Sequence, residues 1–236
     1  MQKNLAILFC SFRPAQYTEQ VRDGREKEYR ICLSRALDVI PLDRFDVVVV
    51  DNTVGDLDGV RLQELRELLL NDTRITDVFF LSENIGEKNK GQGELLMLNS
   101  VLENIEPGKY KNISYITARR IFANPYVFEK TDSMTKEALL SNPDFYYLDG
   151  KVAKTESGLF NDMFFSMSDS LMRRYATFSM ANIPYNIRNN LGSEQNLFRF
   201  VVENNIEYEW LKWLGVIRND WMLDQKQDSF ANVHIC

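Results

Sequence analysis

The hydrophobic residues of this chain form short continuous runs, separated by longer segments in which they recur every three or four positions. Four runs, at residues 5–9, 45–50, 77–81 and 112–117, are rich in β-branched and aromatic side chains, as is typical of strands buried on both faces. The periodicity between them predicts three amphipathic helices, the first of which ends before Pro41. Strands that alternate with helices across short loops predict a parallel sheet covered by helices on both faces.

Each of these three helices has one apolar face, which we expect to pack against the sheet. The residues expected in the core are Tyr29, Leu33, Ala36, Leu37 and Ile40 in the first helix, Leu62, Leu65, Leu68 and Leu69 in the second, and Leu95, Leu98, Val101, Leu102 and Ile105 in the third. The first helix is expected to follow the charged segment 22–30, and the third to open after a polar loop that ends at Gly93.

The pattern of hydrophobic positions changes after residue 117, where the apolar segments become richer in aromatic residues. The elements predicted there are two strands over 144–150 and 159–166, a helix capped by Ser168 or Asp169, a helix over 194–204 capped by Ser193, and a last strand or docking segment over 208–213. With no internal repeat and no clear linker, the pattern predicts one α/β domain over 1–218, with a Rossmann-type, mostly parallel central sheet, and a polar tail over 219–236.

Composition narrows the class of protein. The 236 residues are 44% hydrophobic and 26% charged, which is ordinary for a globular domain. A formal net charge of −6 argues against binding along a nucleic-acid backbone. No apolar run approaches the 18 residues or so of a membrane span, so the expected location is the cytoplasm, and peripheral membrane contact through a basic or aromatic patch stays open.

Cysteine and histidine usage excludes several kinds of site. Cys10, Cys32 and Cys236 are widely spaced and form no C-x-x-C pattern, which suggests neither a disulfide framework nor a zinc knuckle. His234 is the single histidine and lies near the C-terminus, so Ser-His-Asp and Cys-His mechanisms are not expected. Carboxylates are then the expected acids and bases.

The polar residues that follow the four strands are the candidate chemistry, because ligands bind outside the carboxyl ends of parallel strands. These segments are Ser11-Phe12-Arg13, Asp51-Asn52, the stretch 84–93, and Thr117-Ala118-Arg119-Arg120. The stretch 84–93 contains neither G-x-G-x-x-G nor the Gly-Lys-Ser/Thr of a P-loop, so a dinucleotide or ATP site is not indicated.

The order of these segments resembles that of the GT-A glycosyltransferases, in which a βαβαβ unit binds a nucleotide-sugar donor. In that family an acidic residue after the second strand contacts base or ribose, and a turn with Asn-x-Gly elements follows the third, here Asn84-Ile85-Gly86 and Asn89-Lys90-Gly91. The resemblance covers about residues 4–215, and it implies a nucleotide-binding half over 1–120 and an acceptor-binding half over 121–218. The donor-binding residues that it implies are Ser11, Arg13, Asp51, Asn52, Asn84, Gly86, Lys88 and Asn89.

Two carboxylates are candidates for acid–base work under this resemblance. The segment 191–195 is similar to the one in which inverting members carry an acidic residue at a helix start, which implies that Glu194 takes the proton of the acceptor hydroxyl. Asp162 lies in a segment, 161–165, that resembles the strand shaping the acceptor side, and it is the second candidate.

The metal motif of the family is replaced in this chain. GT-A enzymes usually carry Asp-x-Asp after the fourth strand, where this chain has Arg119 and Arg120. Guanidinium groups cannot ligate a hard cation, but they can bind and neutralise a leaving diphosphate. The hypothesis is metal-independent transfer, in which Arg119 or Arg120 stabilises the leaving nucleotide, and a divalent Mn²⁺ or Mg²⁺ ion is the less favoured alternative.

The function expected is transfer of a sugar from a nucleotide-sugar donor to a hydroxyl of a glycan acceptor, in surface polysaccharide or glycoconjugate synthesis. The partners are then the nucleotide-sugar and the glycan, with no nucleic acid, and the pattern sets no oligomeric state. A sugar nucleotidyltransferase is one alternative, although it would typically carry a glycine-rich loop where residues 11–14 have no glycine. A non-catalytic nucleotide- or sugar-binding module is the other.

Overall fold

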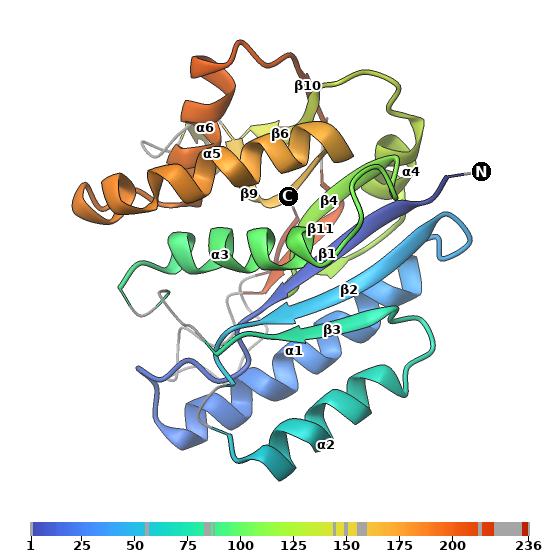
Figure 1. Ribbon diagram of the computed structural model, residues 1–236, viewed down its shortest axis with the longest axis vertical. Helices are drawn as coiled ribbons and strands as arrows, with labels where there is room; N and C mark the ends of the chain where they lie inside the picture. Colours follow the sequence, from blue (N-terminus) through green and yellow to red (C-terminus); the bar gives the residue numbers. More distant parts are fainter. Residues whose placement is uncertain are drawn as a thin grey trace.

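The computed structural model describes residues 2–54, 57–82, 86, 88–143, 145–148, 151–154, 160–211, 214–219 and 233–235. They contain a seven-stranded central sheet whose strands are β1 (Asn4–Cys10), β2 (Phe45–Asp51), β3 (Asp77–Phe80), β4 (Asn112–Thr117), β6 (Leu139–Pro143), β9 (Phe160–Ser168) and β10 (Tyr208–Trp210). The strand order is β10-β6-β9-β4-β1-β2-β3, and every neighbouring pair is parallel except those that β9 makes with β4 and β6 (Figure 1). The predicted α/β fold with a mostly parallel sheet is confirmed.

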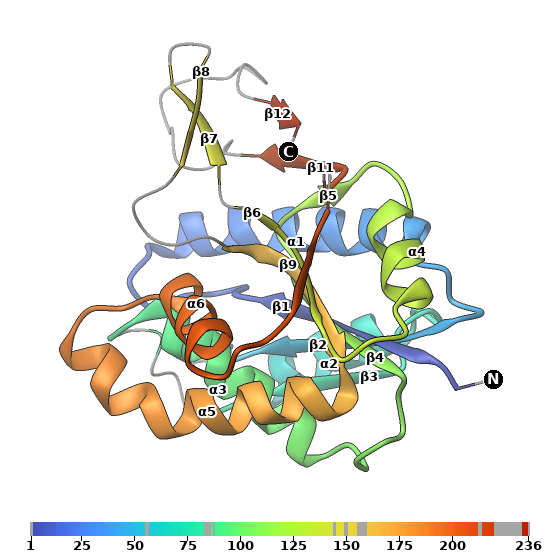
Figure 2. The same ribbon diagram turned by 90° about the horizontal axis from the view of Figure 1, so that it is seen from above.

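Helices cover both faces of this sheet (Figure 1, Figure 2). One face carries α1 (Glu19–Val39), α2 (Gly59–Leu70) and α4 (Tyr126–Ser133), and the other carries α3 (Lys90–Glu103), α5 (Asp169–Arg188) and α6 (Ser193–Glu203). Two hydrophobic cores result, one on each side of the sheet.

Strand β1 shows why its sequence is apolar without alternation. Ala6 and Leu8 belong to the core beneath α1, and Ile7 and Phe9 belong to the core beneath α3, because successive side chains point to opposite faces. All seven residues of β1 are buried. A fully buried Leu, Ile or Phe side chain stabilises the fold by about 1.5–3 kcal/mol, so the middle of the sheet is its most strongly held part.

Two smaller sheets lie beside the central one. The strands β5 (Ile121–Phe122), β11 (Val216–Asn219) and β12 (Val233–Ile235) form an antiparallel sheet, and β7 (Phe145–Leu148) pairs with β8 (Lys151–Lys154) in a hairpin. The strand predicted over 144–150 corresponds to β7, which pairs with β8 outside the central sheet. Strand β6 was not predicted. Strand β11 runs across the predicted domain boundary at 218.

Two helices differ from the sequence prediction, α1 in its first residue and α2 in its buried face. Helix α1 begins at Glu19 and so includes the charged segment 22–30, because its acidic residues pair with a buried arginine described below. In α2, Leu65 and Leu69 are buried as predicted, but Leu68 is 45% exposed because it lies to one side of the narrow stripe that faces the sheet.

Cap residues were predicted correctly for one of the two C-terminal helices. Ser168 is the N-cap of α5, and its side chain accepts a hydrogen bond from the backbone N–H of Leu171 at 3.3 Å. The N-cap of α6 is Gly192 instead of Ser193, and the Gln195 side chain accepts from the Gly192 N–H at 2.7 Å.

Among the residues that the structure describes, no helix combines the length and apolar character needed to cross a membrane.

Candidate functional site

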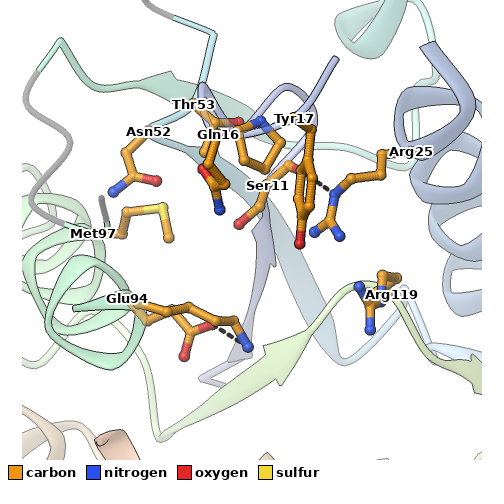
Figure 3. A pocket seen from close by; sticks show the side chains of 12 residues that line it. Ser11, Gln16, Tyr17, Arg25, Asn52, Thr53, Glu94, Met97 and Arg119 are labelled. Carbon is orange, nitrogen blue, oxygen red and sulfur yellow. Dashed lines mark hydrogen bonds and ion pairs between the residues drawn. The ribbon is translucent and has the colours of Figure 1, made fainter. Parts of the chain in front are cut away.

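The topology of the sheet singles out the junction between β1 and β4. The chain passes from β1 outward to β2 and β3, and then returns to β4 on the other side of β1. Ligands of open α/β sheets bind at such a switch point, outside the carboxyl ends of the strands. A cavity of about 230 Å³, the first cavity, lies there (Figure 3); its lining residues are Ser11, Pro14, Gln16, Tyr17, Arg25, Asn52, Thr53, Gly86, Lys90, Glu94, Met97 and Arg119.

Asp51 holds the loops on one side of this cavity in place. Its carboxylate accepts hydrogen bonds from the backbone N–H groups of Phe12 at 2.7 Å and Thr53 at 2.5 Å, and from the Thr53 hydroxyl at 2.9 Å. Burial raises the pKa of Asp51 above its usual range, and these hydrogen bonds partly oppose that rise. Asp51 is fully buried and does not line the cavity; its hydrogen bonds connect the loop after β1 to the loop after β2.

Arg13 also lies away from the cavity. Its guanidinium pairs with Asp23 at 2.8 Å, Glu26 at 3.1 Å and Glu19, all on α1. Burial works against the charge, but the bonds from Asp23 and Glu26 and the charge of Glu19 together raise the pKa of Arg13. The positive charge that the sequence analysis assigned to a donor is therefore neutralised by α1, and Arg13 organises the loop after β1 instead.

Two other arginines form the cationic side of the first cavity. Arg25, which the sequence analysis did not select, donates from Nε to the Ser11 carbonyl at 3.3 Å, and its guanidinium lies over the rings of Tyr17 and Tyr29 at 5.3 and 5.7 Å from their centroids. Arg119, a predicted residue, is partly buried on the same side, across from Asn52 and Glu94 (Figure 3). Two guanidinium groups in one cavity favour the binding of an anion such as a diphosphate.

Asn52 supplies an uncompensated donor at the other side of the cavity. Its side chain is 4% exposed, and among the described residues its Nδ2 has no hydrogen-bond partner. A buried amide N–H without a partner is costly, so it marks a position where a ligand oxygen would be stabilising. Gly93 permits this arrangement, because a Cβ there would lie 2.8 Å from Gly86 Cα and 3.2 Å from Asn52 Nδ2.

A second cavity, of about 390 Å³, adjoins the first. Its lining residues are Gly86, Lys88, Asn89, Lys90, Gly91, Glu94, Asn190, Gly192, Ser193 and Glu194. Gly86, Lys90 and Glu94 line both cavities, so the two hollows share one wall.

This second cavity is formed where the N-termini of α3 and α6 meet. Helix α3 begins at Lys90, four residues earlier than predicted, and Asn89 and Gln92 both donate from their side chains to the Leu191 carbonyl at 3.0 Å. Glu194 is the second residue of α6 and is partly buried. A helix N-terminus favours a negative charge at this position, which keeps a carboxylate available to accept a proton.

A buried amide network holds the two helices together behind the cavities. Asn186 donates to Gln92 Oε1 at 3.1 Å and to Asn196 Oδ1 at 2.8 Å, and Asn196 donates in turn to Ser179 Oγ at 2.8 Å. All four side chains are 0% exposed. Such a network stabilises one relative position of α3, α5 and α6, because any shift leaves buried polar groups unsatisfied.

The structure brings seven of the twelve predicted residues into the two cavities, and places the others elsewhere or does not describe them. Ser11, Asn52, Gly86 and Arg119 line the first cavity, and Gly86, Lys88, Asn89 and Glu194 line the second. The residues outside these linings are Arg13, Asp51 and Arg120. Asn84 lies outside the described residues; Asp162 is in β9, and its side chain is likewise outside what the structure describes.

Arg120 lies beneath α1 instead of in a cavity. Its residue is 8% exposed, and it is close enough to Cys32 that its charge lowers the pKa of that thiol, against the larger effect of burial, which raises it to about 12. Of the two consecutive arginines, Arg119 therefore remains the candidate for anion binding.

Arg25 and Glu94, which the sequence analysis did not select, could have been identified from their spacing relative to buried apolar residues of the same helix. Arg25 precedes the buried Tyr29 by one helical turn, and Glu94 precedes the buried Leu98 by one turn. Both charged residues thus continue a buried stripe toward the strand ends. A charged side chain on such a stripe is a candidate site residue.

Among the described residues, no group of three His, Cys, Asp or Glu side chains is arranged to hold a metal ion.

Comparison with known proteins agrees with the fold. No family model matches the chain, and no curated protein matches it in sequence. Among solved structures, one similar to this chain is the crystal structure of a protein proposed to be a nucleotide-diphospho-sugar transferase, from Desulfovibrio desulfuricans G20. The two share 10% sequence identity and superpose with a TM-score of 0.56 over 89% of this chain and 80% of the other. At this identity the likeness is one of fold.

Proposed function

We propose that this chain is a glycosyltransferase that moves a sugar from a nucleotide-sugar donor to a hydroxyl of a glycan acceptor, without a divalent metal. The observation that carries the proposal is the pair of adjoining cavities at the switch point. One is lined by two arginines and by the Asn52 amide, whose Nδ2 has no hydrogen-bond partner among the described residues, and the other by a carboxylate at a helix start. The neighbour in the fold comparison is consistent with this general kind of reaction.

The donor nucleotide would occupy the first cavity. Arg25 and Arg119 would neutralise its diphosphate, and Asn52 would donate to one of its oxygens. The negative charge that develops on the leaving diphosphate would be stabilised by these two guanidinium groups, so no metal ion is needed for that task. Arg25 is held by Ser11 and by two tyrosine rings, and it would lose little side-chain entropy on binding.

The acceptor would enter the second cavity, where Glu194 acts as the base. In the reaction the acceptor oxygen forms a bond to the anomeric carbon, the bond from that carbon to the diphosphate oxygen breaks, and Glu194 takes the hydroxyl proton. The products are the glycosylated acceptor and a nucleoside diphosphate. Asp162 remains the second candidate for this proton transfer, and the product would serve surface polysaccharide or glycoconjugate synthesis.

A thermal-shift screen tests the donor half of the proposal. UDP, GDP, dTDP and CMP would each be added to the chain, with and without EDTA, since a ligand that binds the native state raises its apparent stability. We expect one nucleotide to raise Tm equally in both conditions. No shift with any nucleotide would refute the proposed function, and a shift that requires Mn²⁺ or Mg²⁺ would refute its metal independence.

Matched variants assign the contacts. Arg119→Gln is expected to weaken the binding of that nucleotide by at least about tenfold, because it removes a charge-assisted bond. Arg35→Gln changes an exposed arginine of α1 that forms a surface pair with Asp38, and it should leave the affinity unchanged. Equal effects of the two variants would contradict the placement of the diphosphate.

Turnover then separates an enzyme from a binding module. Release of nucleoside diphosphate from the matching nucleotide-sugar should be slowed at least about 100-fold by Glu194→Gln, with nucleotide affinity retained. A chain that binds the nucleotide but never releases it from a sugar would be a binding module. Formation of a nucleotide-sugar from a nucleoside triphosphate and a sugar phosphate would identify a nucleotidyltransferase instead.

A further inference from the structure

The wall shared by the two cavities determines where a transferred sugar must lie. If the proposed function holds, the nucleotide fills the first cavity and the acceptor the second, so the sugar between them lies against Gly86, Lys90 and Glu94. Glu94 provides the carboxylate of this wall, and it is 5% exposed (Figure 3).

The Glu94 carboxylate is held in a defined position. Its Oε2 accepts from the Tyr115 hydroxyl at 2.9 Å and from the Ser193 hydroxyl at 3.5 Å, and its Oε1 lies 3.4 Å from Lys90 Nζ. The Tyr115 ring is itself fully buried and stacked between two other aromatic rings. Because the tyrosine cannot move away, the carboxylate is presented to the cavities in one orientation.

An ionised carboxylate recognises one kind of neighbour and rejects another. It accepts hydrogen bonds and donates none, so hydroxyl groups are its natural ligands, whereas a second carboxylate beside it is repelled. Among the residues that the structure describes, Asn52 Nδ2 has no hydrogen-bond partner, which is independent evidence that a ligand oxygen belongs in the first cavity next to this wall.

We propose that Glu94 selects an uncharged sugar, by accepting hydrogen bonds from its hydroxyls, and discriminates against donors whose sugar carries a carboxylate. The substrate class is then a nucleoside-diphosphate hexose and not the corresponding hexuronate. Lys90, whose side chain is 73% exposed, does not cancel this effect, because an exposed ammonium is well solvated and contributes little.

The test compares each hexose with its own uronic acid on one nucleotide. Calorimetric titration of the full chain would use the nucleoside diphosphate identified above, alone and linked to glucose, galactose, mannose and their uronic acids. We expect the best hexose donor to bind at least about 100-fold more tightly than its uronate. In Glu94→Gln, which keeps the shape and removes the charge, this ratio should fall below about tenfold.

Controls keep the outcomes distinct. Glu103→Gln alters an exposed residue at the end of the same helix and should leave the ratio as in the unmodified chain. If the bare nucleotide fails to bind, the proposed function is refuted and this inference with it. If the nucleotide binds but the unmodified chain takes a uronate as tightly as its hexose, or Glu94→Gln keeps the full ratio, only this inference is overturned.

A second variant covers the case in which Glu94→Gln does not fold. Tyr115→Phe removes the hydroxyl that orients the carboxylate but keeps its charge. It should weaken hexose binding by roughly three- to tenfold while discrimination against the uronate persists. Unchanged hexose affinity in a folded Tyr115→Phe variant would overturn the role assigned to the held carboxylate.

Discussion

The contact between the N-termini of α3 and α6 should be the most sensitive point of the site to a single added carbon. Gly91 is the second residue of α3, and a Cβ built there would lie 2.4 Å from the backbone nitrogen of Ser193 and 3.0 Å from the carbonyl carbon of Gly192. Ordinary contacts of this kind begin at 3.4 Å, so Gly91→Ala forces the two helix ends about 1 Å apart.

Two effects of opposite sign decide the magnitude. Alanine is favoured over glycine in a helix by up to about 1 kcal/mol, which would stabilise the variant. Overpacking against rigid backbone costs about 1–3 kcal/mol, because neither partner is the end of a flexible side chain. We expect the overpacking to win, with a net loss of about 1–2 kcal/mol in the free energy of unfolding.

The assay is urea denaturation of Gly91→Ala beside Gly59→Ala. Gly59 opens α2 and has open space around its Cβ position, so its replacement should be neutral or stabilising by up to about 1 kcal/mol. Nucleoside diphosphate release from the donor should fall by up to about 100-fold in Gly91→Ala, since Glu194 moves with α6. If Gly91→Ala is as stable as Gly59→Ala, the close approach of the two helices is refuted.

Three further predictions concern groups outside the cavity walls. Asn186→Leu should lower the free energy of unfolding by about 2–4 kcal/mol in denaturant titrations, because it leaves the buried side-chain amides of Gln92 and Asn196 without this hydrogen-bond partner. A loss below about 1 kcal/mol would contradict the network. Arg13→Met should lower Tm by several degrees and leave nucleotide affinity within about threefold; a large affinity loss at unchanged Tm would return Arg13 to the binding site. Although burial acts in the opposite direction, hydrogen bonds from Arg44 and Asn4 lower the pKa of Asp132. The ionised carboxylate therefore stabilises the fold above about pH 4, and this stabilisation is lost as the pH falls through the folded-state pKa of Asp132. The Tm gap between the unmodified chain and Asp132→Asn should then be present at pH 7 and narrow as the pH falls through the folded pKa of Asp132, and a constant gap would exclude the linkage.

The strand ends illustrate how far sequence reasoning reached into the site. Ser11, Asn52 and Arg119 were found because they directly follow buried strands, and parallel strands bring their carboxyl ends to one edge. Arg13 satisfies the same rule and is nevertheless outside the cavity. Its side chain is long, and the carboxylates that capture it lie on a helix whose start the sequence analysis placed too late.

Residues that enter the site from helices were harder to find. Arg25 and Glu94 lie in the second turns of α1 and α3, which begin earlier than their apolar periodicity suggests, and both side chains line the cavity. Gly91 and Gly93 read as loop residues, since glycine is unfavourable inside helices. They are helical here because close approach to Ser193 and Gly86 requires the absence of a side chain.

The sequence by itself determined the alternation of strands and helices over residues 5–117, the mostly parallel character of the sheet and the edge at which a ligand would bind. These properties follow from local patterns of burial and from the rule that parallel strands share an end. Only the tertiary structure decided which charged residues face that edge. An arginine finds its partner through space, and the choice between Arg13, Arg25, Arg119 and Arg120 depends on where α1 places its carboxylates and aromatic rings.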